Sequence, residues 1–155
     1  MVFAERLRRL LPALWAGWLL CLALLATPAP FATLDGPMAG RVVGRMLAQD
    51  AYTGIALGVL VLVLERVAAR RRAAGGQGSQ FSTGMALALG ALFCTVAGYF
   101  GLQPMMVAAR AGQGALSFGQ LHAISAGFFV VKLALVLALA WRGAAGPVLS
   151  RPASS

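Results

Sequence analysis

Residues 116–141 read LSFGQLHAISAGFFVVKLALVLALAW, and Lys132 is the single lysine, arginine, aspartate or glutamate among them. A helix needs about 20 apolar residues, at a rise of 1.5 Å each, to cross about 30 Å of hydrocarbon. This stretch is long enough and apolar enough to do so, and Arg142 follows directly after it. The segment therefore predicts a membrane-spanning helix.

The composition of the whole chain agrees with this prediction. Of its 155 residues, 60% are hydrophobic and only 11% are charged, whereas about a quarter of the residues in a soluble domain are charged. The net charge of +9 comes from arginines at the edges of apolar runs, which is typical of topology signals that face anionic lipid headgroups. We therefore predict the lipid bilayer as a partner and exclude nucleic acid.

Three further apolar stretches predict three further spans. Residues 10–34 and 82–102 carry no charge, whereas residues 51–64 are too short to span alone. We therefore expect one long helix from about 38 to 72, which takes Asp50 into the membrane. We expect Pro12 in the first turn of the first span, the pair Pro28 and Pro30 at its end, and Gln103-Pro104 at the end of the third.

The predicted fold is an all-α membrane protein with a four-transmembrane-helix bundle. A basic N-terminal segment, 1–9, precedes a single membrane domain, 10–142, and a disordered tail, 143–155, follows it. Within the domain, the expected spans are about 10–30, 46–65, 82–102 and 117–141, and residues 73–79 form a flexible linker by composition. No long internal repeat is visible in the sequence.

The distribution of arginines predicts that both termini lie in the cytoplasm. With that orientation the inner segments carry nine arginines and the outer segments three, as the positive-inside rule requires. The inner set is Arg6, Arg8, Arg9, Arg66, Arg70, Arg71, Arg72, Arg142 and Arg151, and the outer set is Arg41, Arg45 and Arg110. We therefore expect a multi-pass protein of the bacterial inner (cytoplasmic) membrane.

Small residues at helical spacing indicate where helices pack. Gly54 and Gly58 form a GxxxG motif in the second span, and Ala86, Gly90, Cys94 and Gly98 place a small residue at every fourth position of the third. Such residues allow close approach of helices in lipid. We expect these two faces to meet, although homodimerisation through the same stripe and chance spacing both remain open.

Lys132 is the residue that most needs an explanation. It precedes Arg142 by ten residues, or about 15 Å along a helix, which is close to mid-bilayer. Residues of this kind usually face the bundle interior, and His122, Ser125, Phe129 and Lys132 share one helix face. We expect that face to point inward; the alternative is that Lys132 extends its flexible stem to the cytoplasmic interface.

Asp50 and His122 are predicted at a similar depth near the outer side. They are candidates for an ion pair or a proton-accepting pair, and Asp50 could instead pair with Arg45. Thioether and imidazole groups gather on the same side, and such ligands suit copper(I). Met105, Met106 and His122 are thus weak metal candidates, with ordinary packing as the alternative. The candidate functional polar residues are Arg41, Arg45, Asp50, Arg110, His122, Ser125 and Lys132.

Sites of familiar enzymes are missing from the sequence. It has one histidine and four carboxylates, and no GxSxG, P-loop or HExxH motif. We predict no enzyme activity and no cofactor. The leading hypothesis is a non-enzymatic scaffold, accessory or stress-related protein, with a membrane-protein partner or a homo-oligomer. The alternative is a small transporter or permeation pathway for a metal ion or proton.

Several short motifs resemble one known family. They are Leu14-Trp15-Ala16-Gly17, Pro28-Ala29-Pro30-Phe31, residues 39–45 (AGRVVGR), Tyr52-Thr53-Gly54, residues 100–105 (FGLQPM) with Arg110, and Phe118 with residues 121–125 (LHAIS). From about Leu10 to Trp141 the chain resembles the bacterial domain-of-unknown-function 4149 family, which is similar to eukaryotic proteins of the transmembrane-protein-205 type. The resemblance implies a four-helix inner-membrane protein without an established biochemical activity. It also implies a neutral polar residue at the position of Lys132, from which this chain departs.

Overall fold

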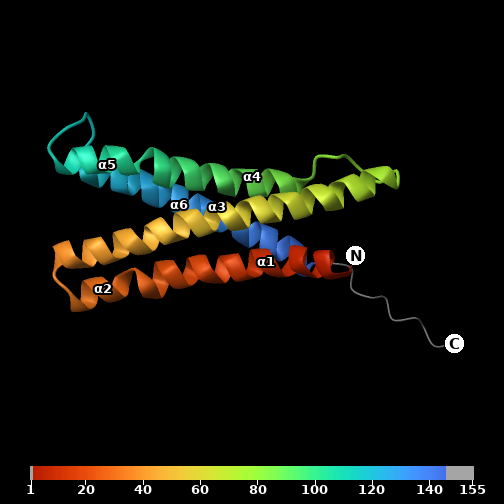
Figure 1. The fold of residues 1–155 in the computed structure, drawn as a ribbon, viewed down its shortest axis with the longest axis horizontal. Helices are drawn as coiled ribbons and strands as arrows, with labels where there is room; N and C mark the ends of the chain where they lie inside the picture. The colour runs from red at the N-terminus through yellow and green to blue at the C-terminus, as the bar shows by residue number, and fades with distance from the viewer. Residues whose placement is uncertain (1, 146–155) are drawn as a thin grey trace.

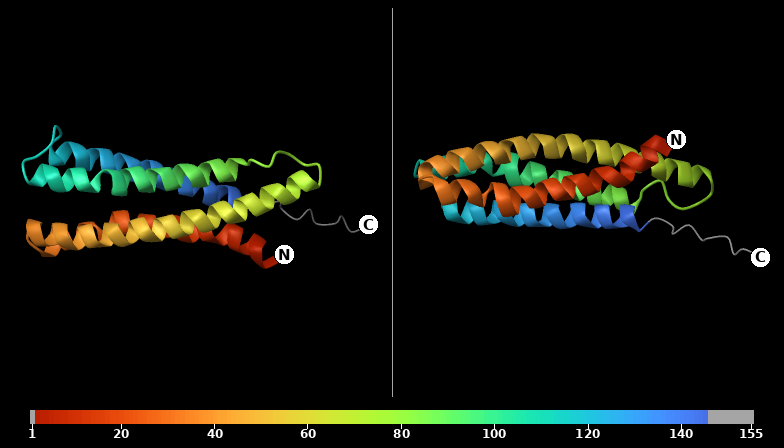
Figure 2. Two further views of the ribbon diagram at one scale, coloured as in Figure 1. Left: turned by 45° about the horizontal axis from the view of Figure 1, so that its top comes forward. Right: turned by 90° about the horizontal axis from the view of Figure 1, so that it is seen from below.

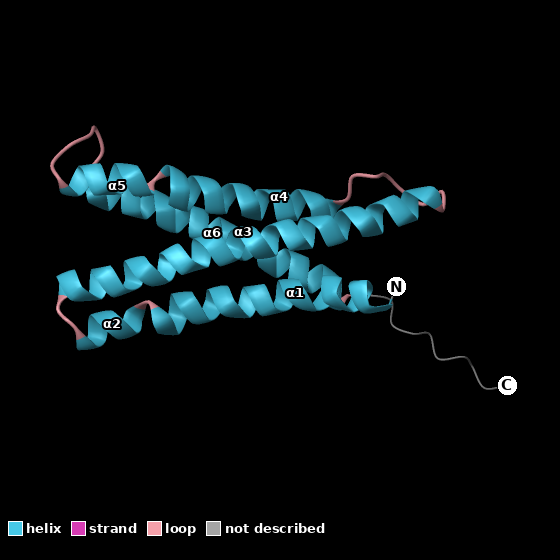
Figure 3. Ribbon diagram, in the orientation of Figure 1, coloured by secondary structure: helices cyan, strands magenta, loops and turns pink. Residues whose placement is uncertain are grey.

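The computed structural model describes residues 2–145, which form helices joined by turns (Figures 1 and 3). Four helical rods are long and apolar enough to cross a membrane, which confirms the predicted all-α membrane fold. The elements are α1 (Val2–Cys21), the π-helical turn η1 (Leu22–Ala26), α2 (Pro28–Thr33), α3 (Gly36–Ala74), α4 (Thr83–Thr95), the π-helical turn η2 (Val96–Gly101), α5 (Gln103–Arg110) and α6 (Phe118–Ala144).

The rods form two helical hairpins that pack side by side (Figure 2). The first hairpin consists of α1, η1, α2 and α3, and the second of α4, η2, α5 and α6. Helix α6 packs against both α1 and α4, and α3 packs against the same two helices. The start of α1 and the end of α6 lie at one end of the bundle, here named the termini end, and α2 and α5 lie at the other, the α2–α5 end (Figure 1).

Polar side chains define where the helices begin. Asp35 accepts a hydrogen bond from the Met38 backbone N–H at 2.7 Å, before α3. Ser82 accepts one from Met85 before α4, and Ser117 exchanges two hydrogen bonds with Gln120 in a capping box before α6. These bonds satisfy backbone donors that have no partner within the helix.

Glycine ends two of the helices in the same way. Gly76 and Gly112 both have φ of 73°, a conformation that residues with a Cβ rarely adopt. The N–H of Gln77 bonds to the carbonyl of Arg72 at 2.8 Å, and that of Gln113 bonds to Ala108 at 2.9 Å. This is the Schellman arrangement, which turns the chain sharply after a helix.

Helical structure continues through Pro28 and Pro30 to Thr33, so our prediction that this pair ends the first helix was wrong, whereas the run of α4 and η2 does end at Gly101, just before Gln103-Pro104, as predicted. After η1 the chain resumes as α2 at Pro28, and after η2 it resumes as α5 at Gln103, with Pro104 in the first turn. The N–H of Thr27 bonds to the carbonyl of Leu22 five residues earlier, at 2.9 Å. The wider π-turn absorbs the backbone mismatch created by prolines, which lack an N–H.

The first helix is longer than the sequence indicated, whereas the second is as predicted. Helix α1 begins at Val2 instead of near residue 10, so Pro12 lies inside it and is buried. Helix α3 runs from Gly36 to Ala74, close to the expected limits of 38 and 72. The tail predicted to be disordered lies mostly outside the described residues.

The core of the bundle is centred on Trp15 of α1. Its side chain is fully buried and packs with Ala16 and Leu19 of the same helix, Ala91 of α4 and Val136 of α6. A second cluster nearer the termini end joins Val61, Ala88 and Leu139. The bundle is thus closely packed along the axis on which the polar residues described below lie.

Candidate functional site

Lys132 and Asp50 form a salt bridge inside the bundle. The Lys132 Nζ lies 2.7 Å from the Asp50 Oδ2, and the two side chains are only 5% and 4% exposed. A helical side chain leans toward the N-terminus of its helix, so the Lys132 stem extends toward the α2–α5 end and away from Arg142. The alternative that Lys132 reaches the interface near Arg142 is therefore wrong.

The second oxygen of Asp50 is also engaged. The indole Nε1 of Trp18 donates a hydrogen bond to Asp50 Oδ1 at 3.1 Å, and the Lys132 Nζ lies 4.9 Å from the centre of the Phe129 ring. Three helices, α1, α3 and α6, thus each contribute one polar group to this central triad of Trp18, Asp50 and Lys132. Because charges attract more strongly in a medium of low polarity, the contact couples the three helices.

The position of the two charges follows from the architecture of the two hairpins. Asp50 lies fifteen residues after Asp35, which caps α3, and Lys132 lies fifteen residues after Ser117, which caps α6. Both helices start at the α2–α5 end (Figure 1). Helices α3 and α6 run in the same direction on opposite sides of the bundle, each packed against α1 and α4, so the same distance along both brings the carboxylate and the ammonium to the same level.

The structure corrects the partners predicted for Asp50. His122 is exposed and stacks on the Phe118 ring, with centroids 5.9 Å apart and planes 17° apart. The Arg110 guanidinium covers Phe118 at 4.4 Å from the ring centre, and Arg45 is exposed. His122 lies ten residues before Lys132, so it belongs to the α2–α5 end and neither it nor Arg45 bonds to Asp50.

The predicted inward face of α6 is only partly inward. Lys132 is buried, and Ser125 is half-buried and donates a hydrogen bond from Oγ to the Gly98 carbonyl of η2 at 2.8 Å. His122, in contrast, is exposed, although the adjacent Leu121 is buried, so His122 lies outside the buried face of this turn. Arg41 is also exposed, and its Nη2 contacts the Met38 sulfur at 3.4 Å.

The two small-residue faces do not meet as predicted. A Cβ at Gly90 would lie 3.0 Å from Leu135, and one at Gly98 would lie 2.6 Å from Phe128, so this stripe faces α6. Gly54 and Gly58 instead receive the Trp15 ring of α1 and side chains from another face of α4. Sequence spacing correctly assigned Gly54 and Gly58 to a contact with α4, but it assigned the stripe of α4 to α3, whereas that stripe faces α6. Cys94, in the same stripe as Gly90, is buried.

Trp15 carries a buried polar atom without a partner. The Trp15 Nε1 is buried and forms no hydrogen bond, and leaving such a donor unsatisfied costs about 1–3 kcal/mol. The neighbouring Thr95 hydroxyl donates to its own helix, to the Ala91 carbonyl at 2.9 Å. The interior near the central triad therefore keeps one unused donor.

The predicted metal ligands lie at the surface. Met105 and His122 are exposed and Met106 is half-buried. Within residues 2–145, no three His, Cys, Asp or Glu side chains come close enough to hold a metal ion. Cys21 is exposed, Cys94 is buried, and both are free thiols.

A second cluster of charges joins α1 to α3 near the termini end. Arg8 donates to Glu65 Oε1 at 2.7 Å and to both oxygens of Glu5, and Arg9 donates to Glu5 at 2.9 Å. Glu65 is buried, and its carboxylate fills the space where Gly84 has no side chain. Glu5 precedes the apolar stretch, and the hydrogen bond from Arg8, assisted by Arg9, lowers the pKa of its carboxyl to about 2.

Sequence reasoning missed both Trp18 and this second cluster. A usable signal existed for the cluster, because Glu65 is the one acidic residue beside the arginines that end the second span, and Glu5 stands among the arginines before the first. Antiparallel neighbours bring those two segments together. Trp18 offered no such signal, since an aromatic residue in a span is common near either interface.

Comparison with known proteins places the chain in a family. A family model described as "Domain of unknown function (DUF4149)" matches residues 10–115, about two thirds of the chain. This range includes Trp18 and Asp50 and ends before α6, which carries Lys132. No curated protein and no solved structure matches. The chain therefore belongs to the DUF4149 family, a family of unknown function, and is a membrane protein by its four spans.

Proposed function

We propose that this protein is a non-enzymatic scaffold or accessory subunit of the bacterial inner membrane, with a stress-related role as one form of such a function. One observation carries the proposal: the two charges of the central triad are bonded to each other within the protein. The Asp50 carboxylate bonds to Lys132 and Trp18. A residue that binds cargo or performs chemistry must present a free group to it.

The central triad then has a structural task. Lipid provides little drive for helices to associate, so close packing and polar contacts between helices must do so. A buried ion pair adds little net stability, yet it penalises every arrangement in which either charge is left alone. The bond between Lys132 and Asp50 therefore favours one register of α3 against α6, which suits a rigid framework for a partner.

Crosslinking in native membranes tests the scaffold role. A photoreactive residue at Val131, exposed on α6, would give a discrete product with one partner protein, whereas the same residue at the exposed Leu24 of η1 serves as a control for lipid-facing positions. Adducts with lipid alone at both positions would contradict the proposal. Robust transport by the purified protein alone would contradict the scaffold role and favour a transport function.

The alternative function is a small permeation pathway for a proton or metal ion. It is favoured by the ionisable pair of Asp50 and Lys132 within the spans, since such residues often mark ion pathways, and by the unused N–H of Trp15 nearby. Vesicles containing the wild-type protein would then show a proton or metal-ion flux that Asp50→Asn abolishes. A flux equal to that of empty vesicles would count against this alternative.

A further inference from the structure

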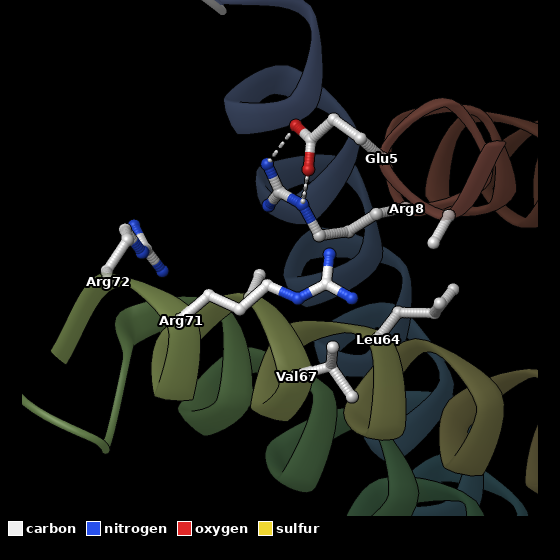
Figure 4. A pocket seen from close by; sticks show the side chains of 8 residues that line it. Glu5, Arg8, Leu64, Val67, Arg71 and Arg72 are labelled. Atoms are coloured by element: carbon white, nitrogen blue, oxygen red, sulfur yellow. Dashed lines mark hydrogen bonds and ion pairs between the residues drawn. The ribbon is translucent and has the colours of Figure 1, made fainter. Parts of the chain in front are cut away.

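A pocket of about 280 Å³ opens between α1 and α3 near the termini end (Figure 4). Its floor is apolar and includes Leu64 and Val67 of α3. Its rim is charged and consists of Glu5 and Arg8 from α1 and Arg71 and Arg72 from α3. An apolar floor beneath a cationic rim matches an amphiphilic anion.

Arg71 and Arg72 carry the free charge of this rim. The carboxylates of Glu5 and Glu65 are occupied by Arg8 and Arg9, and Arg8 uses its Nε, Nη1 and Nη2 on them. Within residues 2–145, neither Arg71 nor Arg72 forms a salt bridge with a carboxylate. Two arginines therefore remain able to bind an external anion.

The direction of Arg71 supports this assignment. Its side chain extends across the pocket, and its guanidinium lies between Arg8 and the apolar floor of Leu64 and Val67 (Figure 4). An arginine on an exposed helix end would otherwise turn outward into water, away from another cation. The guanidinium forks of Arg residues bind phosphate oxygens in pairs.

The depth of the pocket matches the headgroup layer of a bilayer. Leu64 ends the apolar run of α3, and Arg71 follows seven residues later, or about 10 Å along the helix. The polar layer on each side of the hydrocarbon is about 5–7 Å thick, and the Arg71 side chain covers the remaining distance because it leans back toward the N-terminus of α3, so that its guanidinium lies beside Leu64 and Val67 (Figure 4). A phospholipid whose acyl chains contact Leu64 and Val67 would thus place its phosphate at the level of Arg71 and Arg72.

We propose that the pocket between α1 and α3 binds the phosphate headgroup of an anionic phospholipid, with Arg71 and Arg72 on the phosphate and Leu64 and Val67 against the acyl chains. Basic pockets between membrane helices are suited to such headgroups. The site is separate from the central triad, and it does not depend on the scaffold role. A water-soluble phosphate shares the chemistry of the rim but cannot use the floor.

Lipid titration of the full-length protein in neutral detergent, followed by native mass spectrometry, tests the proposal. The probes are phosphatidylglycerol, zwitterionic phosphatidylcholine, and glycerol phosphate, the last having no acyl chains. Phosphatidylglycerol is expected to bind most tightly. Each of Arg71→Gln and Arg72→Gln should weaken it about fivefold, from the usual contribution of one basic residue at a membrane surface.

Arg66→Gln and Arg70→Gln are matched controls, because they remove the same charge from the same part of α3 and do not line the pocket. They should leave the binding of phosphatidylglycerol unchanged, and Leu64→Ala should weaken phosphatidylglycerol but not glycerol phosphate. Equal loss in controls and test variants would overturn the site in favour of diffuse attraction. Equal binding of phosphatidylcholine, or of glycerol phosphate, would overturn the anionic lipid as the ligand.

Discussion

Replacing Lys132 by leucine should destabilise the protein, although leucine is the more natural residue for a membrane helix. The substitution leaves the Asp50 carboxyl without its main partner at a position where its side chain is 4% exposed. Removing one member of a buried ion pair costs about 3–5 kcal/mol, and an unpaired charge at the centre of a span costs about 2.5–3.5 kcal/mol on insertion scales. We therefore expect a loss of about 3 kcal/mol in the free energy of unfolding.

The double variant Asp50→Leu/Lys132→Leu should recover most of that loss. Buried ion pairs can often be replaced by apolar residues at little cost, so the double variant is expected within about 1 kcal/mol of the wild type, apart from the hydrogen bond that Trp18 loses. Asp50→Leu alone should be about as harmful as Lys132→Leu. These values imply a coupling energy of about 5 kcal/mol between the two positions, above the range of about 0.5–3 kcal/mol that is usual for residues in contact, because each single variant leaves a buried charged group without its partner.

Reversible unfolding by sodium dodecyl sulfate in mixed micelles, followed by circular dichroism, measures the free energies of unfolding of the wild type, the two single variants and the double variant. Val131→Leu on the exposed side of α6 serves as the control and should change the free energy by less than about 0.5 kcal/mol. Additive effects, in which the double variant loses as much as the two single variants together, would refute the reasoning. So would a Lys132→Leu variant that is more stable than the wild type.

Three other results are expected. Gly58→Leu should prevent the close packing of α3 against α4, because even a Cβ at this position would lie 2.6 Å from a side chain of α4. Gly44→Ala serves as its control, because a Cβ there meets nothing within 4 Å. It should raise thermal stability in detergent slightly, through a gain in helix propensity of up to about 1 kcal/mol. Trp18→Phe keeps the ring but removes the hydrogen bond to Asp50, and should cost about 1.5–3 kcal/mol in the same unfolding assay, the usual value for a bond to a charged group. The pKa of Glu5 is lowered from 4.5 to about 2, so its ion pairs stabilise the fold fully above pH 4.5, and this stabilisation is lost as the pH falls toward 2. Glu5→Gln should therefore flatten the dependence of thermal stability on pH in that range. A dependence equal to that of the wild type would contradict this.

The fold was predictable because its signals are local. Apolar runs longer than a bilayer core define the spans, and the helix that takes in Asp50 was recovered because its apolar part alone is too short to cross. The π-turns were not predictable: Pro28 and Pro104 indicate a break, but whether a helix stops or resumes after a proline depends on what packs against it. In η2, for example, the Gly98 carbonyl accepts a hydrogen bond from Ser125 of α6. The two residues are far apart in the sequence, so the local pattern around the proline does not reveal this contact.

Both charged members of the central triad were predicted from the sequence, but their pairing and the contribution of Trp18 were not. Counting residues inward from Arg142 placed Lys132 correctly near the centre of the bundle, whereas counting from the start of the second span placed Asp50 beside His122. The second count failed because α3 has 39 residues, about 58 Å at 1.5 Å each, so the start of this helix does not mark the membrane surface. Counting from the helix caps would have matched Asp50 with Lys132.

The pairing has a consequence for how the two hairpins assemble. Asp50 belongs to the first hairpin and Lys132 to the second, so each hairpin alone would hold an uncompensated charge in hydrocarbon, at several kcal/mol. Docking removes both penalties together, but only in one register, because a slip by a single helical turn moves one group by about 5.4 Å relative to a contact of 2.7 Å. Gly54 and Gly58 of α3 lie against Thr95 and Leu92 of α4 across the same interface between the hairpins. Close packing and the ion pair therefore favour one and the same register, which gives the costly lysine a structural role in an otherwise uncharged span.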